Sequence, residues 1–108
     1  MSDFTVRDML DMQRRLQEQY KGRWEPVCPA TGKNKLLWMI GEIGEVIDIV
    51  KKRNVETAPA GSDVRRDLIE ELADVLMYYN DVLLCYGITS EELQQAYTEK
   101  FQRNMTRW

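Results

Sequence analysis

The stretch "WMIGEIGEVIDIVKK", residues 38–52, combines a helical apolar pattern with two carboxylates. Its apolar side chains recur at intervals of three and four residues, which is the spacing of one face of an α-helix. Glu42 and Glu45 lie among them, three residues apart. With about 100° of rotation per residue, Glu42 is flanked by apolar neighbours on both sides and Glu45 lies at the edge of that face. The stretch therefore predicts a core helix with one acidic edge.

Start and stop signals outside this stretch predict an all-α chain that assembles its helices into a four-helix bundle-like fold. At 108 residues the chain fits one domain, residues 1–108. Asn34 and Ser62 are suitable N-caps, Gly87 is a suitable helix end, and Thr89 with Glu92 forms a capping box. The connection "KGRWEPVCPATGKN", residues 21–34, is long for a small domain, and such loops are often functional. The expected helices cover about residues 4–20, 34–53, 63–86 and 90–106.

The composition excludes several kinds of chemistry. The chain has no histidine, which removes the commonest general base and the commonest zinc ligand. Cys28 and Cys85 have no metal-binding spacing and are expected to be unpaired thiols of a cytoplasmic protein. A net charge of −3 argues against a nucleic-acid polymer as partner, and no apolar run of membrane length or signal peptide indicates a membrane partner or export. An enzyme of this composition would use carboxylates, a metal, or both.

A second acidic pair occurs in "EELADVLMYYNDVLLCYG", residues 70–87. Glu71 and Asp74 are three residues apart and share a helix face with Tyr78. Two helices packed about 8–10 Å apart would bring both acidic pairs face to face. Four carboxylates in a poorly solvated site need a counter-charge, and ligands that are all oxygen suit Mg²⁺, with Mn²⁺ as a substitute. The two pairs together predict a magnesium site.

Other readings of these carboxylates have to be weighed. A single E-x-x-E or E-x-x-D on a helix is usually part of a solvated face. A ferritin-like di-iron bundle needs Glu-x-x-His on two helices, which a chain without histidine cannot supply. A purely structural helical oligomer would pair the carboxylates with Lys or Arg across helices. That last reading predicts no effect of Mg²⁺ on the melting temperature, whereas an acidic metal site predicts stabilisation.

The last predicted helix carries a polar stripe. In "AYTEKFQRNMTRW", residues 96–108, Tyr97, Lys100, Asn104 and Arg107 recur at spacings of three, four and three. The two cations could simply complement the negative end of the helix dipole. The combination of phenol, ammonium, amide and guanidinium is better suited to an anionic ligand lying against the helix.

At this point the sequence resembles a known family. "GEIGEVIDIVKK", residues 41–52, followed by "EELADVLMYYNDVL", residues 70–83, is similar to the E-x-x-E … E-x-x-D signature of the MazG-like nucleotide pyrophosphohydrolases, in the all-α NTP pyrophosphatase superfamily. The closing Y-x-x-K-x-x-x-N-x-x-R stretch is similar to the segment that follows the metal motif in that family. The resemblance covers about residues 35–108.

The resemblance implies a Mg²⁺-dependent enzyme that cleaves a nucleoside triphosphate between its α and β phosphates, giving the monophosphate and pyrophosphate. It implies house-cleaning of the nucleotide pool and assembly as a homodimer or dimer of dimers. A sensor or regulatory module that binds nucleotide and metal without hydrolysis is the alternative. The implied metal ligands are Glu42, Glu45, Glu71 and Asp74, and the implied phosphate-binding residues are Lys100, Asn104 and Arg107.

The sequence does not decide which residue activates the attacking water or which residues contact the nucleobase. Either Glu42 or Glu45 could take the proton of the attacking water. Tyr78 would lie at the sugar or base end of the pocket. Trp24 and Trp38 could stack on a base, although Trp38 is better explained as a core residue. The sequence does not identify the preferred base.

Overall fold

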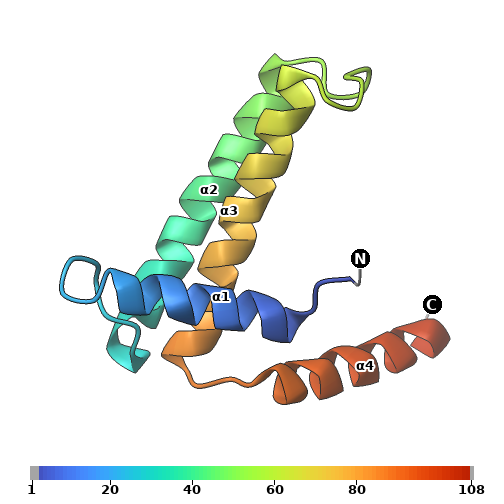
Figure 1. Ribbon diagram of the computed structural model, residues 1–108. Coiled ribbons are helices and arrows are strands. Elements are labelled where there is room, and N and C mark those ends of the chain that lie inside the picture. The colour runs from blue at the N-terminus through green and yellow to red at the C-terminus, as the bar shows by residue number, and fades with distance from the viewer. Residues whose placement is uncertain (1–2, 108) are drawn as a thin grey trace.

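The structure is a computed structural model that describes residues 3–107, and it is entirely helical over that range (Figure 1). Four α-helices are present, as predicted, and no strand forms among the described residues. A short 3₁₀ helix, η1 (Pro29–Thr31), precedes the second of them. The α-helices are α1 (Val6–Gln19), α2 (Gly32–Lys52), α3 (Asp63–Cys85) and α4 (Ser90–Arg107).

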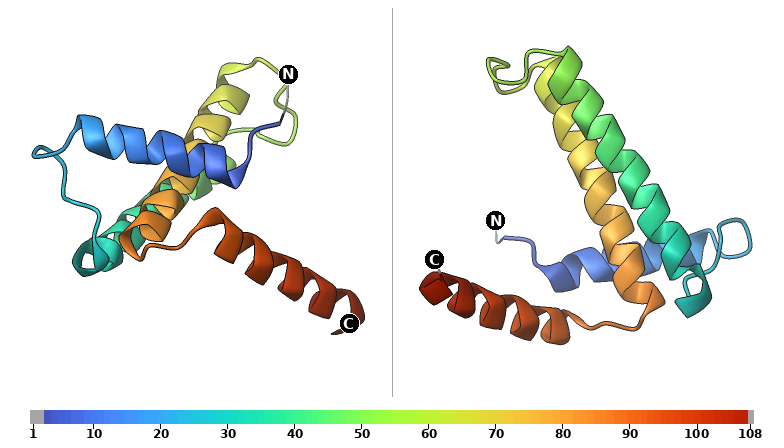
Figure 2. Two further views of the ribbon diagram at one scale, coloured as in Figure 1. Left: turned by 60° about the horizontal axis from the view of Figure 1, so that its bottom comes forward. Right: turned by 180° about the vertical axis from the view of Figure 1, so that it is seen from behind.

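The two longest helices form an antiparallel hairpin, and α1 crosses it near one end (Figures 1 and 2). An ion pair between Arg53 Nη1 and Asp67 Oδ2, 2.6 Å apart, joins the end of α2 to the beginning of α3. At the other end of the hairpin, α1 packs against α3. Within the described residues, the buried apolar side chains are Leu10 of α1 and Leu83 and Cys85 of α3. The small core therefore lies where α1 meets α3.

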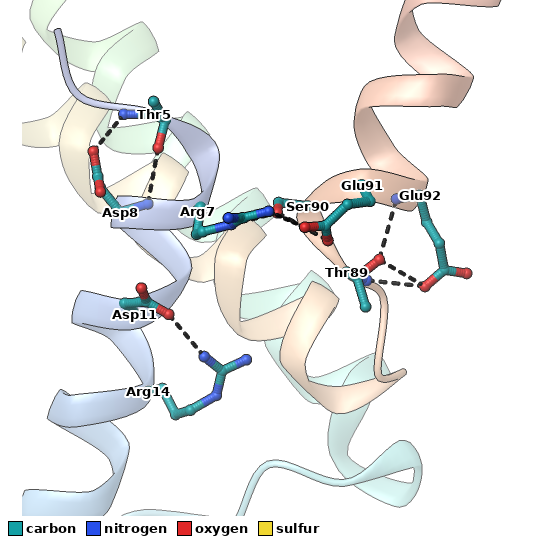
Figure 3. Close-up of polar contacts among 9 residues, drawn as sticks. All are labelled: Thr5, Arg7, Asp8, Asp11, Arg14, Thr89, Ser90, Glu91 and Glu92. Atoms are coloured by element: carbon teal, nitrogen blue, oxygen red, sulfur yellow. Dashed lines mark hydrogen bonds and ion pairs between the residues drawn. The ribbon is translucent and has the colours of Figure 1, made fainter.

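Local signals fix the helix boundaries. Thr5 forms a capping box with Asp8, and Thr89 forms one with Glu92 (Figure 3). Gly87 has a φ of 64°, which only glycine adopts without strain, and it ends α3 as predicted. The prediction of Asn34 as an N-cap is wrong, because η1 leads directly into α2 at Gly32.

The last helix, α4, leaves the other three and makes its helix-to-helix contacts with α1 alone (Figures 1 and 2). Arg7 of α1 holds its first turn, donating to Ser90 Oγ over 3.4 Å and forming an ion pair with Glu91 (Figure 3). None of the described residues of α4 is buried. A single chain therefore supplies four helices without closing them into one bundle.

Gly41 and Gly44 do not serve a close approach between helices of this chain. A Cβ atom placed on either glycine would meet nothing within 4 Å, and both residues are exposed. Neither glycine is therefore needed for a close approach of α2 to another helix within one chain. Each glycine lowers the stability of the helix by about 1 kcal/mol relative to alanine, and no packing interaction within the single subunit offsets that cost.

Candidate metal centre

The α2–α3 hairpin brings three carboxylates together. One oxygen each of Glu42, Glu71 and Asp74 lies within 4.8 Å of the others, and all three residues are half-buried. Glu42 comes from α2, whereas Glu71 and Asp74 lie almost one turn apart on α3. We call these three residues the acidic cluster.

Within residues 3–107, no ion pair involves a carboxylate of the acidic cluster. The ion pairs of residues 3–107 involve other carboxylates: those of Asp11, Asp48, Asp63, Asp67 and Glu91. Among the described residues of one chain, the paired carboxylates therefore form no interhelical salt bridges. The cluster is instead an accumulation of like charge.

The pKa of Glu71 reflects the repulsion between the carboxylates of the cluster. Its pKa is raised, first by a hydrogen bond that it can share with the Glu42 carboxyl when one of the two is protonated. Burial and the charges of Glu42, Asp74 and Glu45 raise the pKa further. When both glutamates are ionised they can only accept, so the buried Oε2 atom of Glu71 has no donor. The site lacks a positive partner.

The donor set fits a hard divalent cation. Three carboxylates supply oxygen ligands only, which suits Mg²⁺ or Mn²⁺ and disfavours softer metals. The orphaned Glu71 Oε2 is a buried acceptor that such an ion would satisfy. A cation would also reverse the repulsion that raises the pKa of Glu71.

Glu45 stands apart from the acidic cluster. It is exposed and does not share the 4.8 Å grouping of the other three carboxylates. Its charge nevertheless contributes to the raised pKa of Glu71, so it lies within electrostatic range of the cluster. The four acidic residues singled out from the sequence therefore form a group of three with a fourth at its margin.

A cavity of about 500 Å³ adjoins the cluster, and Asp74 forms part of its wall. Three aromatic residues from the sequence prediction, Trp24, Trp38 and Tyr78, also line it. Trp38 is 61% exposed, so the expectation that it belongs to the core is wrong. Burial and the nearby charge of Glu42 raise the pKa of Tyr78, so its hydroxyl remains a neutral donor.

The polar stripe of α4 does not reach the cluster within one chain. Tyr97, Lys100, Asn104 and Arg107 are exposed, and α4 contacts neither α2 nor α3. Tyr97, at 76% exposure, instead borders a different hollow between α1 and α4. Within one chain, the predicted phosphate-binding residues and the predicted metal ligands therefore lie apart.

The sequence reasoning missed a group of buried polar residues in the cavity. Gln13, Gln17, Lys35 and Asp81 are each at most 9% exposed, and all four line it. The two glutamines follow Leu10 at spacings of three and four, so they occupy positions where the apolar stripe of α1 would continue. These amides at positions where apolar residues are expected were the signal in the sequence that could have indicated a buried polar group.

Comparisons with known proteins agree with the geometry. No helix within residues 3–107 has both the length and the apolar character that crossing a membrane requires. A search of the curated proteins found no match to the chain. The model of the MazG nucleotide pyrophosphohydrolase domain matches residues 30–107, which include the acidic cluster, Glu45 and α4. The resemblance inferred from the sequence is thereby confirmed, and the chain belongs to the MazG nucleotide pyrophosphohydrolase domain family.

Proposed function

We propose that this protein is a Mg²⁺-dependent pyrophosphohydrolase that cleaves nucleoside triphosphates between the α and β phosphates, as part of nucleotide-pool house-cleaning. The observation that carries the proposal is the acidic cluster, in which three half-buried carboxylates converge without a neighbouring cation among the described residues. Membership of the family supports the reaction class. Such a cluster is costly to maintain unless a ligand neutralises it.

The metal would be held by Glu42, Glu71 and Asp74, with Glu45 at the margin of the set. Mg²⁺ supplies neutralisation of phosphate charge and lowers the pKa of a bound water. Glu71 and Asp74 act as fixed oxygen donors on the rigid hairpin. Between the two candidate bases, the geometry favours Glu45, because it lies at the margin of the cluster and keeps a free carboxylate for the proton of the attacking water.

The working enzyme is proposed to be a homo-oligomer, either a dimer or a dimer of dimers. The radius of gyration of the chain is 16.3 Å, against about 13 Å for a compact domain of its length. Its accessible surface is 8581 Å², against about 6,300 Å² for a compact monomer of 12.8 kDa. The excess of about 2,300 Å² is within the range that one subunit of an obligate complex buries.

The second copy would also bring α4 to the active site. In one chain, α4 exposes the apolar side chains of Phe101 and Met105 next to the polar stripe. Packing this helix on another subunit would bury those side chains. It would also allow Lys100, Asn104 and Arg107 to bind the phosphates of a nucleotide held at the other subunit's acidic cluster.

Product analysis tests the proposal. We expect the protein with Mg²⁺ to convert deoxynucleoside triphosphates to monophosphate and pyrophosphate, as followed by ³¹P NMR, and to be inactive after chelation. Formation of diphosphate and inorganic phosphate would place the cleavage at the wrong bond. Metal-dependent nucleotide binding without any product, from canonical or damaged nucleotides, would favour the sensor instead.

A further inference from the structure

The cavity beside the acidic cluster has a polar floor built from three helices. Gln13 and Gln17 come from α1, Lys35 from α2 and Asp81 from α3, and we call these four residues the polar floor. Because Asp74 lines the same cavity, the floor faces a space that begins at the proposed metal centre. If the phosphates occupy that centre, the remaining part of a nucleotide has this cavity available to it. The inference below rests on the proposed function in that respect.

Hydrogen bonds fix the orientation of the two glutamine side chains. Gln13 Nε2 and Gln17 Nε2 both donate to Asp81 Oδ1, over 2.9 Å and 3.0 Å. Since both amide nitrogens point at the carboxylate, each amide oxygen is left as a free acceptor. Asp81 Oδ2 is likewise without a donor among the described residues. Among the buried and half-buried residues of 3–107, the enclosed side-chain atoms without a partner are Glu71 Oε2 and Asn80 Oδ1. The three oxygens named above therefore keep some exposure, and the residues that carry them line the cavity.

Lys35 adds one donor to this row of acceptors. It is only 7% exposed, yet its ammonium group makes no ion pair or hydrogen bond with the residues that the structure describes. Burial raises the pKa of Asp81, and the charge of Lys35 opposes part of that rise, as do the two glutamine hydrogen bonds. The ammonium nitrogen is not among the enclosed, unpartnered atoms of the described residues, so it keeps some exposure. Because Lys35 lines the cavity, this nitrogen is available to donate to a ligand there.

The pattern of donors and acceptors indicates the kind of base that fits. An exocyclic amine presents two N–H groups, and cytosine, adenine and guanine carry it beside a ring nitrogen or carbonyl that can accept from Lys35. Uracil and thymine instead present carbonyls on both sides of a single N–H, which would meet the acceptors of the floor. We propose that Gln13, Gln17, Lys35 and Asp81 recognise the nucleobase and select triphosphates whose base carries an exocyclic amine.

Aromatic residues of the same cavity suit this occupant. Trp38 and Tyr78 line the cavity above the hairpin residues of the floor, and the π-face of an aromatic ring stacks on any base without strong sequence preference. Trp24, at the loop side, already stacks on Tyr20 with ring centroids 4.4 Å apart. The aromatic rings would therefore contribute affinity, whereas the polar floor would contribute the choice of base.

The variant Asp81→Asn tests the choice of base most sharply. The new amide oxygen can still accept from both glutamines, while its nitrogen replaces the free acceptor with a donor. We expect the wild type to prefer dCTP to dUTP, and dATP to dTTP, by kcat/KM. In the variant the dCTP-to-dUTP ratio should fall by about 10- to 100-fold. Asp11→Asn, an exposed change on α1, should leave the ratio as in the wild type.

The wild-type ratio being near unity, or remaining unchanged in Asp81→Asn, would overturn the proposal. A purely structural role for Asp81 predicts a lower melting temperature with one common loss of rate for all nucleotides. Circular dichroism would establish whether the variant folds.

Lys35→Met provides a second test should Asp81→Asn fail to fold. Removing this donor should raise KM for dCTP at least about 10-fold with little change in kcat. The melting temperature of the free protein should change little, because Lys35 makes no hydrogen bond or ion pair with the described residues. Lys33→Met, an exposed change on the same helix, should alter neither value. A lower melting temperature with an unchanged KM would show that Lys35 is structural and would overturn its assignment.

Failure of the base pocket can be separated from failure of the proposed reaction. Tryptophan fluorescence with dCMP and dUMP measures base recognition without any turnover. Preference for dCMP that is lost in Asp81→Asn supports the pocket even if no triphosphate is hydrolysed. Hydrolysis of all triphosphates at equal rates, with equal binding of the two monophosphates, would overturn the pocket and leave the reaction standing.

Discussion

At the residue scale, the Glu71 carboxylate lies against those of Glu42 and Asp74, with its Oε2 atom buried and without a donor. This arrangement raises the pKa of Glu71 in the folded protein above its ordinary value. The folded state therefore holds the Glu71 proton more strongly than the unfolded chain does. Protonated Glu71 therefore adds to the free energy of unfolding at pH values below its ordinary pKa. This contribution is lost as the pH rises through the raised pKa of the folded protein.

The variant Glu71→Gln should separate the electrostatic cost of the cluster from the benefit of metal. Without metal at pH 7.5, we expect the variant to melt at least as high as the wild type, and the difference to shrink towards pH 5. Mg²⁺ should raise the melting temperature of the wild type more at pH 7.5 than at pH 5, because binding needs the ionised cluster. Mg²⁺ should have little effect on the melting temperature of Glu71→Gln.

Differential scanning fluorimetry with and without Mg²⁺ measures these shifts. Magnesium stabilising the wild type and the variant equally at both pH values would remove the cluster as the metal site.

Some residues of the site could be predicted from the sequence, and others could not. The acidic pairs could be recognised because they interrupt apolar helix faces, and the structure gathers three of the four. Lys35 could not be recognised from the sequence as a buried residue, because its position is equally compatible with an exposed first turn of the helix. Its burial depends on how α1 crosses the hairpin, which is a tertiary property. Trp38 was assigned to the core for its size, but it borders a cavity whose existence only packing determines.

At the scale of the elements, α4 depends on local interactions more than the other helices do. It contributes no buried residue in the chain and contacts only α1. The Thr89–Glu92 capping box and the Arg7 contacts hold its first turn (Figure 3). The beginning of α4 was therefore predictable from its capping residues, whereas the direction of α4 was not, because little intrachain packing determines it.

Thr89→Ala should loosen the first turn of α4. Loss of an N-cap costs about 1 kcal/mol, so amide hydrogen exchange in residues 90–95 should accelerate by about fivefold. Thr98→Ala in the middle of the same helix is the matched control. It should leave exchange unchanged or slow it, because alanine has the higher helix propensity. Equal exchange rates in the Thr89→Ala variant and the wild type would show that contacts other than the cap hold this turn.

At the scale of the whole molecule, one chain leaves too much apolar surface in water. Along α2, five side chains form a continuous exposed stripe that lies to one side of Glu42: Leu36, Ile40, Ile43, Ile47 and Val50. A stripe of this kind on a rigid hairpin is typical of an interface. The sequence predicted residues 38–52 as a core helix, whereas in the single chain the apolar face of this helix is exposed. The symmetry of the assembly depends on a partner's geometry and could not be predicted.

Ile47→Glu should weaken self-association. It places a charge in the centre of the exposed stripe, and burying that charge should raise the dissociation constant by about 100-fold or more. Light scattering coupled to size-exclusion chromatography over a range of concentrations measures the change, with circular dichroism to check folding. Gln19→Glu, an exposed change on α1, should behave as the wild type. A wild type that is monomeric at high concentration would contradict the proposed assembly.

The central claim is that the acidic cluster is the metal centre of a pyrophosphohydrolase, and one measurement tests it most directly. Pyrophosphate release from a panel of deoxynucleoside triphosphates is followed at increasing Mg²⁺ for the wild type, Glu71→Gln and Glu70→Gln. Glu70 is the exposed neighbour of Glu71 and lies outside the cluster. The account predicts Mg²⁺-dependent release by the wild type and Glu70→Gln, with a loss of at least about 100-fold in Glu71→Gln. Release by Glu71→Gln at the wild-type rate and with the same Mg²⁺ dependence would contradict it.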